Sequence, residues 1–229
     1  MKPKHGHFIS LVLIISALIL GCAQTPIKVQ PISKTENPAD HVGRLGAELA
    51  GAREQQVDIL APTWFAKAQA SYNRAKDGLE RGAELAGILD NTAKGRAELQ
   101  QALKATEKSK YHLSEVIESR AMARKAGADR FSKEYNGLER DFLQLTKAVE
   151  EDDFGYVSRH KKAVNSGYRD LELRAIKNAA LDNVRHLLEM LRDKDANKDA
   201  PKSFAMAEAK LNDADAYITE NRYDKDGIR

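Results

Sequence analysis

The chain has 229 residues, of which 42% are hydrophobic and 31% charged, and its 37 basic and 34 acidic residues leave a net charge of +3. This balance excludes the extended basic patch on which nucleic-acid binding normally depends, because the densest basic cluster is the short "RHKK" at 159–162, which fits a solvated helix face. The single cysteine, Cys22, excludes an intrachain disulfide and a cysteine-ligated metal cluster.

Residues 1–21 have the pattern of a secretory signal peptide. A short basic segment, Met1–His7, precedes 13 uncharged residues, Phe8–Leu20. A transmembrane helix needs about 20 apolar residues, and this sequence has turned polar by Gln24. The end of the apolar run, "ILGC" at 19–22, resembles a bacterial lipobox.

The lipobox resemblance implies cleavage between Gly21 and Cys22, which leaves the cysteine as the first residue of the mature chain. Its thiol would carry a diacylglycerol, and its new amino group an acyl chain such as palmitate. We therefore expect Cys22 to anchor a lipoprotein to a membrane; an uncleaved hydrophobic anchor and a buried thiol are the alternatives. Cleavage removes two lysines and no acidic residue, so the mature chain has 35 basic and 34 acidic residues.

Residues 22–40 are expected to form an extended tether between the lipid and the folded region. Pro26, Pro31 and Pro38 interrupt a segment with little apolar content, and proline at this density disfavours a helix. A segment of this length spans at most about 60 Å.

From about His41 onward, the composition predicts an all-α protein, because strong helix formers dominate and aromatic residues are sparse. Apolar residues recur at intervals of three and four within 65–86, 138–149 and 173–191, as on the buried face of a helix. Alanine fills many of these positions. This pattern favours an elongated antiparallel helical bundle, or long helical hairpins, over a thick globular core.

Turn signals divide this region into five predicted helices. They are expected at residues 41–60, 62–89, 93–151, 156–192 and 201–221. Asp40 is expected to cap the first helix, and Pro62 and Pro201 are expected to begin the second and the fifth. A turn at Asp90–Thr92 is expected to separate the second helix from a long third one.

An internal repeat links the second and fifth predicted helices. The segment "APTWFAKAQASYNRAK" at 61–76 aligns without gaps with "APKSFAMAEAKLNDAD" at 200–215, an offset of 139 residues. Eight of the sixteen positions are identical. We interpret this Ala-Pro-x-x-Phe motif as a duplication; a convergent alanine-rich composition is the alternative.

The repeat also predicts structural anchors and a division of the chain. In each copy a proline, Pro62 or Pro201, opens the helix, and a phenylalanine, Phe65 or Phe204, is expected to anchor its first turn. The helical region is accordingly divided into a first repeat half at 41–152 and a second at 153–229. Whether the second half is complete is left open.

The repeated motif also carries a family resemblance. Both "AP..F..A" copies, together with "YRDLELRAIK" at 168–177 and "NRYD" at 221–224, resemble the DUF4398-type helical region over about residues 45–225. That region occurs in bacterial envelope lipoproteins and ahead of the peptidoglycan-binding domain of some OmpA-family proteins. No OmpA-like domain occurs in this chain, so peptidoglycan binding is not carried over by the resemblance.

The resemblance implies a location as well as a fold. It indicates a lipoprotein anchored in the outer membrane and facing the periplasm. Ala23, the residue after the lipidated cysteine, is consistent with this location, because it is not the aspartate associated with inner-membrane retention in enteric bacteria.

Patterns typical of catalysis or metal binding are weak in this sequence. The histidines beyond the signal peptide are His41, His112, His160 and His186, and no two of them have metal-ligand spacing. The loop 193–204 resembles an EF-hand at its first acidic positions, but Lys198 and Phe204 stand where glycine and a bidentate glutamate are required. We expect no catalytic residue, no metal site and no cofactor.

We therefore expect a non-enzymatic envelope lipoprotein with a structural or adaptor role, which contacts an envelope protein or a second copy of itself. The alternative is a periplasmic carrier or chaperone that holds an apolar or peptide ligand between its helices. A helix-lined cavity would favour the carrier, and a continuous exposed apolar stripe would favour the adaptor. The last helix is expected to have a half-covered apolar face, with Arg222–Arg229 frayed.

Overall fold

The protein is all-α, as its composition predicts. The computed structural model describes residues 27–224 and 226–228, and within them it contains helices and turns but no strand. The α-helices are α1 (Pro38–Glu54), α2 (Val57–Leu60), α3 (Pro62–Glu80), α4 (Leu85–His112), α5 (Ser114–Lys125), α6 (Ser132–Glu150), α7 (Phe154–Asp193), α8 (Ala196–Asp199) and α9 (Pro201–Glu220), and one 3-10 turn, η1 (Ala128–Arg130), precedes α6.

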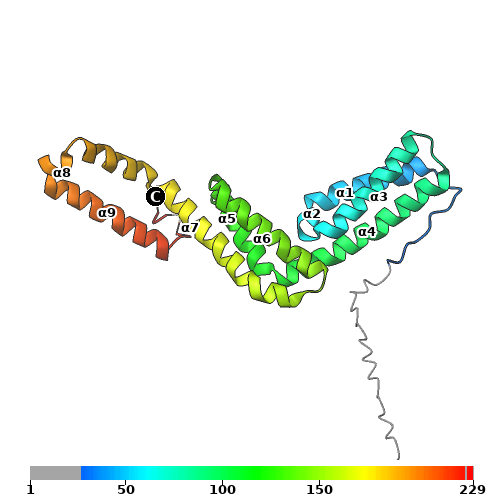
Figure 1. Cartoon of the computed structure of the whole chain (residues 1–229). Helices are drawn as coiled ribbons and strands as arrows, with labels where there is room; N and C mark the ends of the chain where they lie inside the picture. Colours follow the sequence, from blue (N-terminus) through cyan, green and yellow to red (C-terminus); the bar gives the residue numbers. More distant parts are fainter. Residues whose placement is uncertain (1–26, 225, 229) are drawn as a thin grey trace, which may run out of the picture.

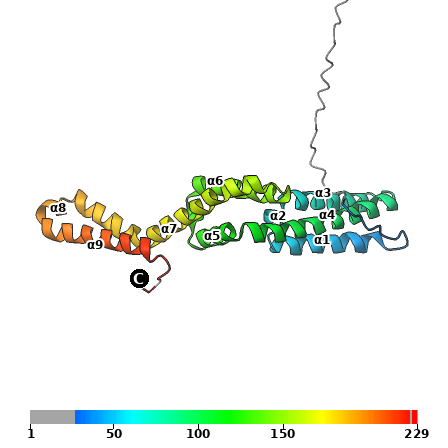
Figure 2. The same ribbon diagram turned by 90° about the horizontal axis from the view of Figure 1, so that it is seen from below.

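The helices form three units arranged end to end in an elongated molecule (Figures 1 and 2). In the first unit, α4 packs against α1 and α3, with the one-turn helix α2 at one end. The middle unit consists of α5, α6 and the first half of α7. The long helix α7 then continues into the terminal hairpin, which we define as residues 177–220 and in which α7 pairs with α9.

Small residues allow α4 to lie close to both α1 and α3 in the first unit. A Cβ atom on Gly95 of α4 would lie 2.8 Å from the Leu45 Cδ2 atom of α1 and 3.3 Å from the Ser71 Cβ atom of α3. Ala68 and Ala102 are fully buried in the same core. Because interiors are packed to the density of organic crystals, glycine and alanine at this contact set how closely the helices approach.

A carboxylate of the middle unit caps a helix of the first unit. The backbone amides of Thr63 and Trp64, in the first turn of α3, each donate a hydrogen bond of 2.9 Å to a carboxylate oxygen of Glu150 at the end of α6. The amides of a first helical turn have no partner within the helix and favour a negative charge. This contact therefore stabilises the start of α3 and joins the two units.

Both predicted ends of the first helix are wrong, and α1 ends at Glu54 and not at Leu60. The first helix begins at Pro38 and not at His41, because Asn37, rather than Asp40, provides the cap: its Oδ1 atom accepts a 3.0 Å hydrogen bond from the Ala39 amide. Residues 27–32 of the predicted tether form no helix, yet Pro31 and Ile32 line a groove beside α4. The end of the tether therefore lies against the first unit.

The predicted turn at Asp90–Thr92 is also wrong, since these residues lie inside α4. The Thr92 hydroxyl donates a 2.8 Å hydrogen bond to the Ile88 carbonyl, which satisfies it within the helix. The chain reverses earlier, at Gly82, whose φ of 65° suits a residue without a Cβ atom.

The predicted third helix, 93–151, is not continuous. The chain is interrupted at Leu113, between α4 and α5, and then reverses at Gly127, which has a φ of 77°. After the reversal at Gly127, the chain continues as helix α6. The middle unit therefore has one more helix than the turn signals indicate.

The two copies of the Ala-Pro motif have the same backbone conformation. Gln56 and Asp195, 139 residues apart, both lie in the left-handed region, with φ of 59° and 61°, and each precedes a single helical turn. That turn ends at Ala61 or Ala200, with φ/ψ of −144°/61° and −135°/60°. The repeat therefore corresponds to a shared tight corner between two helices; a duplication as its origin stays a prediction.

The phenylalanine of each copy is buried at this corner. Phe65 is 4% exposed and Phe204 is 8% exposed. Arg53 lies over the Phe65 ring, with 5.2 Å from the guanidinium carbon to the ring centroid, and Arg192 lies over the Phe204 ring at 5.6 Å. These arginines are also 139 residues apart, so the repeat extends upstream of the segment found by sequence alignment.

Truncation of either phenylalanine tests the importance of the corner. Phe65→Ala and Phe204→Ala should each lower the free energy of unfolding by about 3 kcal/mol, because each removes a buried ring and leaves a cavity. Urea denaturation followed by circular dichroism measures the loss. Tyr111→Ala, at an aromatic residue that is 80% exposed, is the matched control and should change stability by less than about 0.5 kcal/mol. Equally small losses for both phenylalanine variants would contradict the assigned role.

Candidate interaction surface

The most connected polar cluster of the described structure lies inside the middle unit. Arg120 of α5 donates to both carboxylate oxygens of Glu139 on α6, at 2.7 and 2.6 Å, and the Tyr168 hydroxyl of α7 donates to Glu139 at 2.8 Å. Arg120 also donates to the Gln56 side chain of the first unit at 3.3 Å. The cluster therefore connects three helices of the middle unit and joins them to the first unit.

The pKa shifts in this cluster favour a structural role. Burial raises the pKa of Glu139, but hydrogen bonds from Arg120 and Tyr168 outweigh burial and hold it below the ordinary value. Burial and the Glu139 charge raise the pKa of Tyr168, and the same causes raise the pKa of Tyr135 to about 12. A glutamate that stays ionised and tyrosines that stay protonated hold one set of hydrogen bonds across the neutral range.

A second buried polar contact lies between α3 and α4. The Ser71 hydroxyl donates a 2.5 Å hydrogen bond to Glu98, and the Arg74 guanidinium donates to the Ser71 oxygen at 2.8 Å. Ser71 and Glu98 are both buried. These groups satisfy each other inside the helix contact.

The residues weighed as metal ligands do not gather into a site. Within 27–224 and 226–228, no three histidine, cysteine, aspartate or glutamate side chains are arranged to hold a metal ion. In the EF-hand-like segment, Asp195 instead starts the one-turn helix α8, and its carboxylate pairs with Lys198 at 2.7 Å. His41 contacts Glu36 at 2.6 Å and Arg96 at 3.1 Å.

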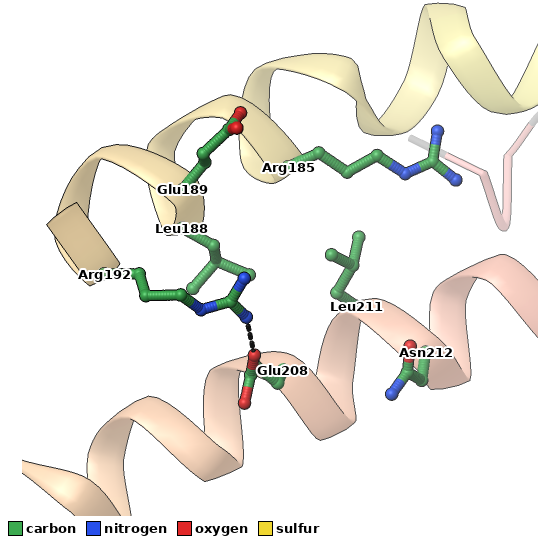
Figure 3. Close-up of a pocket in the computed structure, with 7 residues that line it drawn as sticks. All are labelled: Arg185, Leu188, Glu189, Arg192, Glu208, Leu211 and Asn212. Carbon is green, nitrogen blue, oxygen red and sulfur yellow. Dashed lines mark hydrogen bonds and ion pairs between the residues drawn. The ribbon is translucent and has the colours of Figure 1, made fainter. Parts of the chain in front are cut away.

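One side of the terminal hairpin is polar and carries an open groove of about 490 Å³ (Figure 3). Leu188 of α7 and Leu211 of α9 lie between the two helices, and Arg192 forms an ion pair with Glu208 across the groove. The groove is also lined by Arg185, Glu189 and Asn212. Arg185 also pairs with Asp215 at 2.7 Å. Charged side chains of both helices therefore keep this side of the hairpin solvated.

The other side of the terminal hairpin is apolar and exposed. On α7, Val184, Leu187 and Leu191 are 45%, 54% and 38% exposed. They follow each other at intervals of three and four residues, so they form a stripe along one side of the helix. Leu181 and Leu188 of the same helix are buried, and Leu188 lines the groove between α7 and α9.

Comparison with the first unit shows why this stripe is exposed. At the offset of 139 residues, α1 corresponds to the second half of α7 and α3 corresponds to α9. In the first unit, α4 covers Leu45, which is completely buried; its counterpart Val184 is exposed. Ala52, buried in the core that α4 completes, corresponds to the exposed Leu191.

The same comparison extends the surface onto α9. Residues Ala68, Ser71, Ala75 and Gly78 of α3 face α4, and their counterparts on α9 are Ala207, Lys210, Ala214 and Tyr217. We call the combined surface the apolar face of the terminal hairpin; it consists of Ala180, Val184, Leu187 and Leu191 on α7 and Ala207, Lys210, Ala214 and Tyr217 on α9. Within the described residues, no helix covers this face as α4 covers the first unit.

The residues after α9 contact α7, and Asp224 also accepts a 2.5 Å hydrogen bond from the Tyr217 hydroxyl at one end of this face. The Arg222 guanidinium donates to the Arg169 carbonyl at 3.0 Å, and the Tyr223 hydroxyl donates to Glu172 at 3.2 Å. Glu172 is buried, and a buried carboxylate needs such partners. The prediction that Arg222–Arg229 is frayed is therefore wrong for 222–224.

The predicted site residues divide between those that the structure describes and those that it does not. Gly21 and Cys22, the predicted cleavage and lipid-attachment site, lie outside the described residues. Pro62 and Pro201 begin α3 and α9. Sequence reasoning found the apolar spacing at 173–191 but missed that its outer residues are exposed. The aligned repeat provides a signal, because residues that α4 covers in the first copy correspond to exposed residues of α7.

No family model, curated protein or solved structure matches this chain in comparisons with known proteins. The DUF4398-type resemblance therefore stays a prediction. Among the described residues, no helix is both long and apolar enough to cross a bilayer.

Replacement of Glu139 tests the buried polar cluster. Because the folded-state pKa of Glu139 lies below its ordinary value, its contribution to stability is present above that ordinary value and is lost as pH falls through the folded-state pKa. Glu139→Gln should lower the free energy of unfolding at neutral pH by about 3 kcal/mol, since it leaves Arg120 buried without its ion pair.

The pH dependence provides the second readout of this replacement. Unfolding of Glu139→Gln, measured in urea from about pH 7 to pH 3, should depend less steeply on acid than unfolding of the unmodified protein. Glu118→Gln, at an exposed glutamate of α5, is the matched control and should reproduce the unmodified curve. An unchanged slope for Glu139→Gln would contradict the assigned contribution.

Proposed function

We propose that this protein is a non-enzymatic lipoprotein of the bacterial envelope that acts as an adaptor. Lipid on Cys22 would hold its N-terminal end at the periplasmic side of the outer membrane. The terminal hairpin, at the other end of the helical chain of units, would dock onto another protein. The observation that carries this proposal is the exposed stripe of Val184, Leu187 and Leu191.

Exposure of this stripe to water is unfavourable unless a partner covers it. Burial of apolar surface contributes about 25 cal/mol per Å², and contiguous apolar patches on a soluble surface are typical of interaction sites. The groove side of the same hairpin instead carries the charged residues Arg185, Glu189 and Arg192. A one-sided apolar hairpin supports docking through that side.

The grooves of the described structure do not favour the carrier alternative. The groove of the terminal hairpin is open to solvent, with charged residues on both walls. A wider groove beside α1 and α4 is also open and includes Arg44, Glu48 and Arg96 with Leu99 and Leu103. Apolar ligands bind in concave sites that enclose most of their surface. The adaptor role therefore has the stronger support.

Lipidation is tested directly at Cys22. Cys22→Ser should accumulate as an unprocessed precursor that no longer incorporates labelled fatty acid, because the thiol that receives the diacylglycerol is absent. Metabolic labelling followed by gel electrophoresis and membrane fractionation measures both changes. Processing and labelling equal to the unmodified protein would contradict the lipoprotein proposal.

Docking is tested by site-specific photocrosslinking in intact cells. A photoreactive amino acid at Leu187, on the apolar face, should give crosslinked species of higher mass. The same amino acid at Glu189, two residues away on the polar side of α7, is the matched control and should give few. Equal crosslinking at both positions, or none at Leu187, would contradict docking through the apolar face.

A further inference from the structure

We infer that the apolar face of the terminal hairpin docks against the same face of a second copy of the chain, so that two hairpins form a four-helix bundle. The inference rests on the proposed function in one respect, namely that this face is an interaction surface. It adds the identity of the partner. The reasons come from the comparison with the first unit, the charges of the hairpin and its small core.

The first unit shows what a dedicated single-helix partner requires. Polar contacts position helix α4 against α1. Arg96 of α4 lies 3.1 Å from the His41 Nδ1 atom and 3.9 Å from the Glu48 carboxylate, and both of these residues belong to α1. Glu98 accepts a 2.5 Å hydrogen bond from Ser71 of α3. These contacts fix the position of α4 along the α1–α3 pair.

The terminal hairpin has apolar residues in place of the two α1 groups that contact Arg96, and a lysine in place of Ser71. The counterparts of His41, Glu48 and Ser71 are Ala180, Leu187 and Lys210. An arginine placed as Arg96 is in α4 would meet an alanine and a leucine and would be desolvated without a partner. The apolar face is therefore not suited to a helix with the chemistry of α4; it fits a surface as apolar as itself.

A second copy provides such a surface by symmetry. In a two-fold contact the same residues occur on both sides, so Leu187 and Leu191 of one copy meet apolar residues of the other. Two helical hairpins joined in this way give the four-helix bundle, a stable arrangement with a shared apolar core. The prominent exposed side chains of α7 then fill the space that α4 fills in the first unit.

The charges of the hairpin are compatible with this pairing. Lys210 and Asp213 of α9 correspond to Ser71 and Arg74 of α3, both of which contact residues of α3 or α4 at the covered edge. Lys210 and Asp213 have opposite charges and lie three residues apart. In an antiparallel contact, Lys210 of each copy can therefore pair with Asp213 of the other copy. Residues 177–220 contain seven basic and nine acidic residues, and a net charge of −2 gives only weak repulsion.

The small core of the hairpin explains what docking would provide. The buried apolar residues of the terminal hairpin are Leu181, Leu188, Phe204 and Ile218. Helices in water gain most of their stability from packing of an amphipathic face. A second hairpin would bury the outer side of α7 and α9 and complete a core that is present on one side only.

Sedimentation of the purified protein tests self-docking. The mature chain from residue 22, with Cys22→Ser so that only the lipid is missing, should form a concentration-dependent dimer. Leu187→Glu should weaken the dimer at least about 30-fold, as for a central interface residue. Because Leu187 is 54% exposed, the variant should keep its helical circular dichroism, which separates loss of docking from loss of folding. Glu189→Gln is the matched control and should dimerise normally.

Cysteine crosslinking tests the geometry in the same protein. The Cys22→Ser background contains no other cysteine, so Leu187→Cys should form disulfide-linked dimers under mild oxidation, whereas Glu189→Cys should not. A charge exchange adds a second test: Lys210→Asp and Asp213→Lys should each weaken the dimer, and the double variant should recover it.

The outcomes distinguish the two proposals. A monomer at every concentration, or equal dimerisation by Leu187→Glu, overturns self-docking. If the protein is monomeric and Leu187 crosslinks a different protein in cells, self-docking fails while the adaptor proposal stands. If the purified protein is monomeric and Leu187 crosslinks nothing in cells, both fail. A dimer whose disulfide forms at Leu187→Cys but not at Glu189→Cys supports the inference.

Discussion

A pair of antiparallel helices buries only one side of each helix, and this constraint governs the whole molecule. In the first unit, the third helix α4 completes the core of the α1–α3 pair, and Gly95 lets it approach both. In the middle unit, α5, α6 and α7 cover one another around Phe142 and Tyr168. The terminal hairpin alone has an open side within the described chain. The location of the candidate interaction surface follows from this difference.

The polar contacts between the units determine how rigidly they are joined. Glu150 of the middle unit accepts hydrogen bonds from two backbone amides at the start of α3 in the first unit. Arg120 reaches Gln56 from the middle unit. Together these contacts join the first unit to the middle one.

The helical fold could be predicted from the sequence because its signals are local. Apolar spacing and the prolines at the starts of α3 and α9 identify helices and some of their ends. The boundaries that were missed depend on less local effects. Thr92 looks like a cap but bonds backward within α4, and the reversal at Gly127 depends on one residue with positive φ. A sequence pattern does not distinguish these glycines from those inside helices.

The candidate surface could be predicted only in part. The intervals between Val184, Leu187 and Leu191 indicate an apolar stripe, but a stripe gives no information on whether another helix covers it. The aligned repeat supplies that information once the structure shows that α4 covers Leu45 and Ala52 in the first copy. The Arg120–Glu139–Tyr168 cluster could not be predicted, because its members are far apart in sequence and ordinary in composition.

The length of α7 has a mechanical consequence. Its 40 residues span about 60 Å as one continuous helix. One half is fixed in the middle unit through Val164, Tyr168 and Leu171, and the other half forms one side of the terminal hairpin. A force applied to the terminal hairpin is therefore carried to the middle unit by the consecutive backbone hydrogen bonds of α7. No loop lies between the hairpin and the middle unit along this helix. Tension on the terminal hairpin would therefore reach the middle unit through a helix and not through a loop.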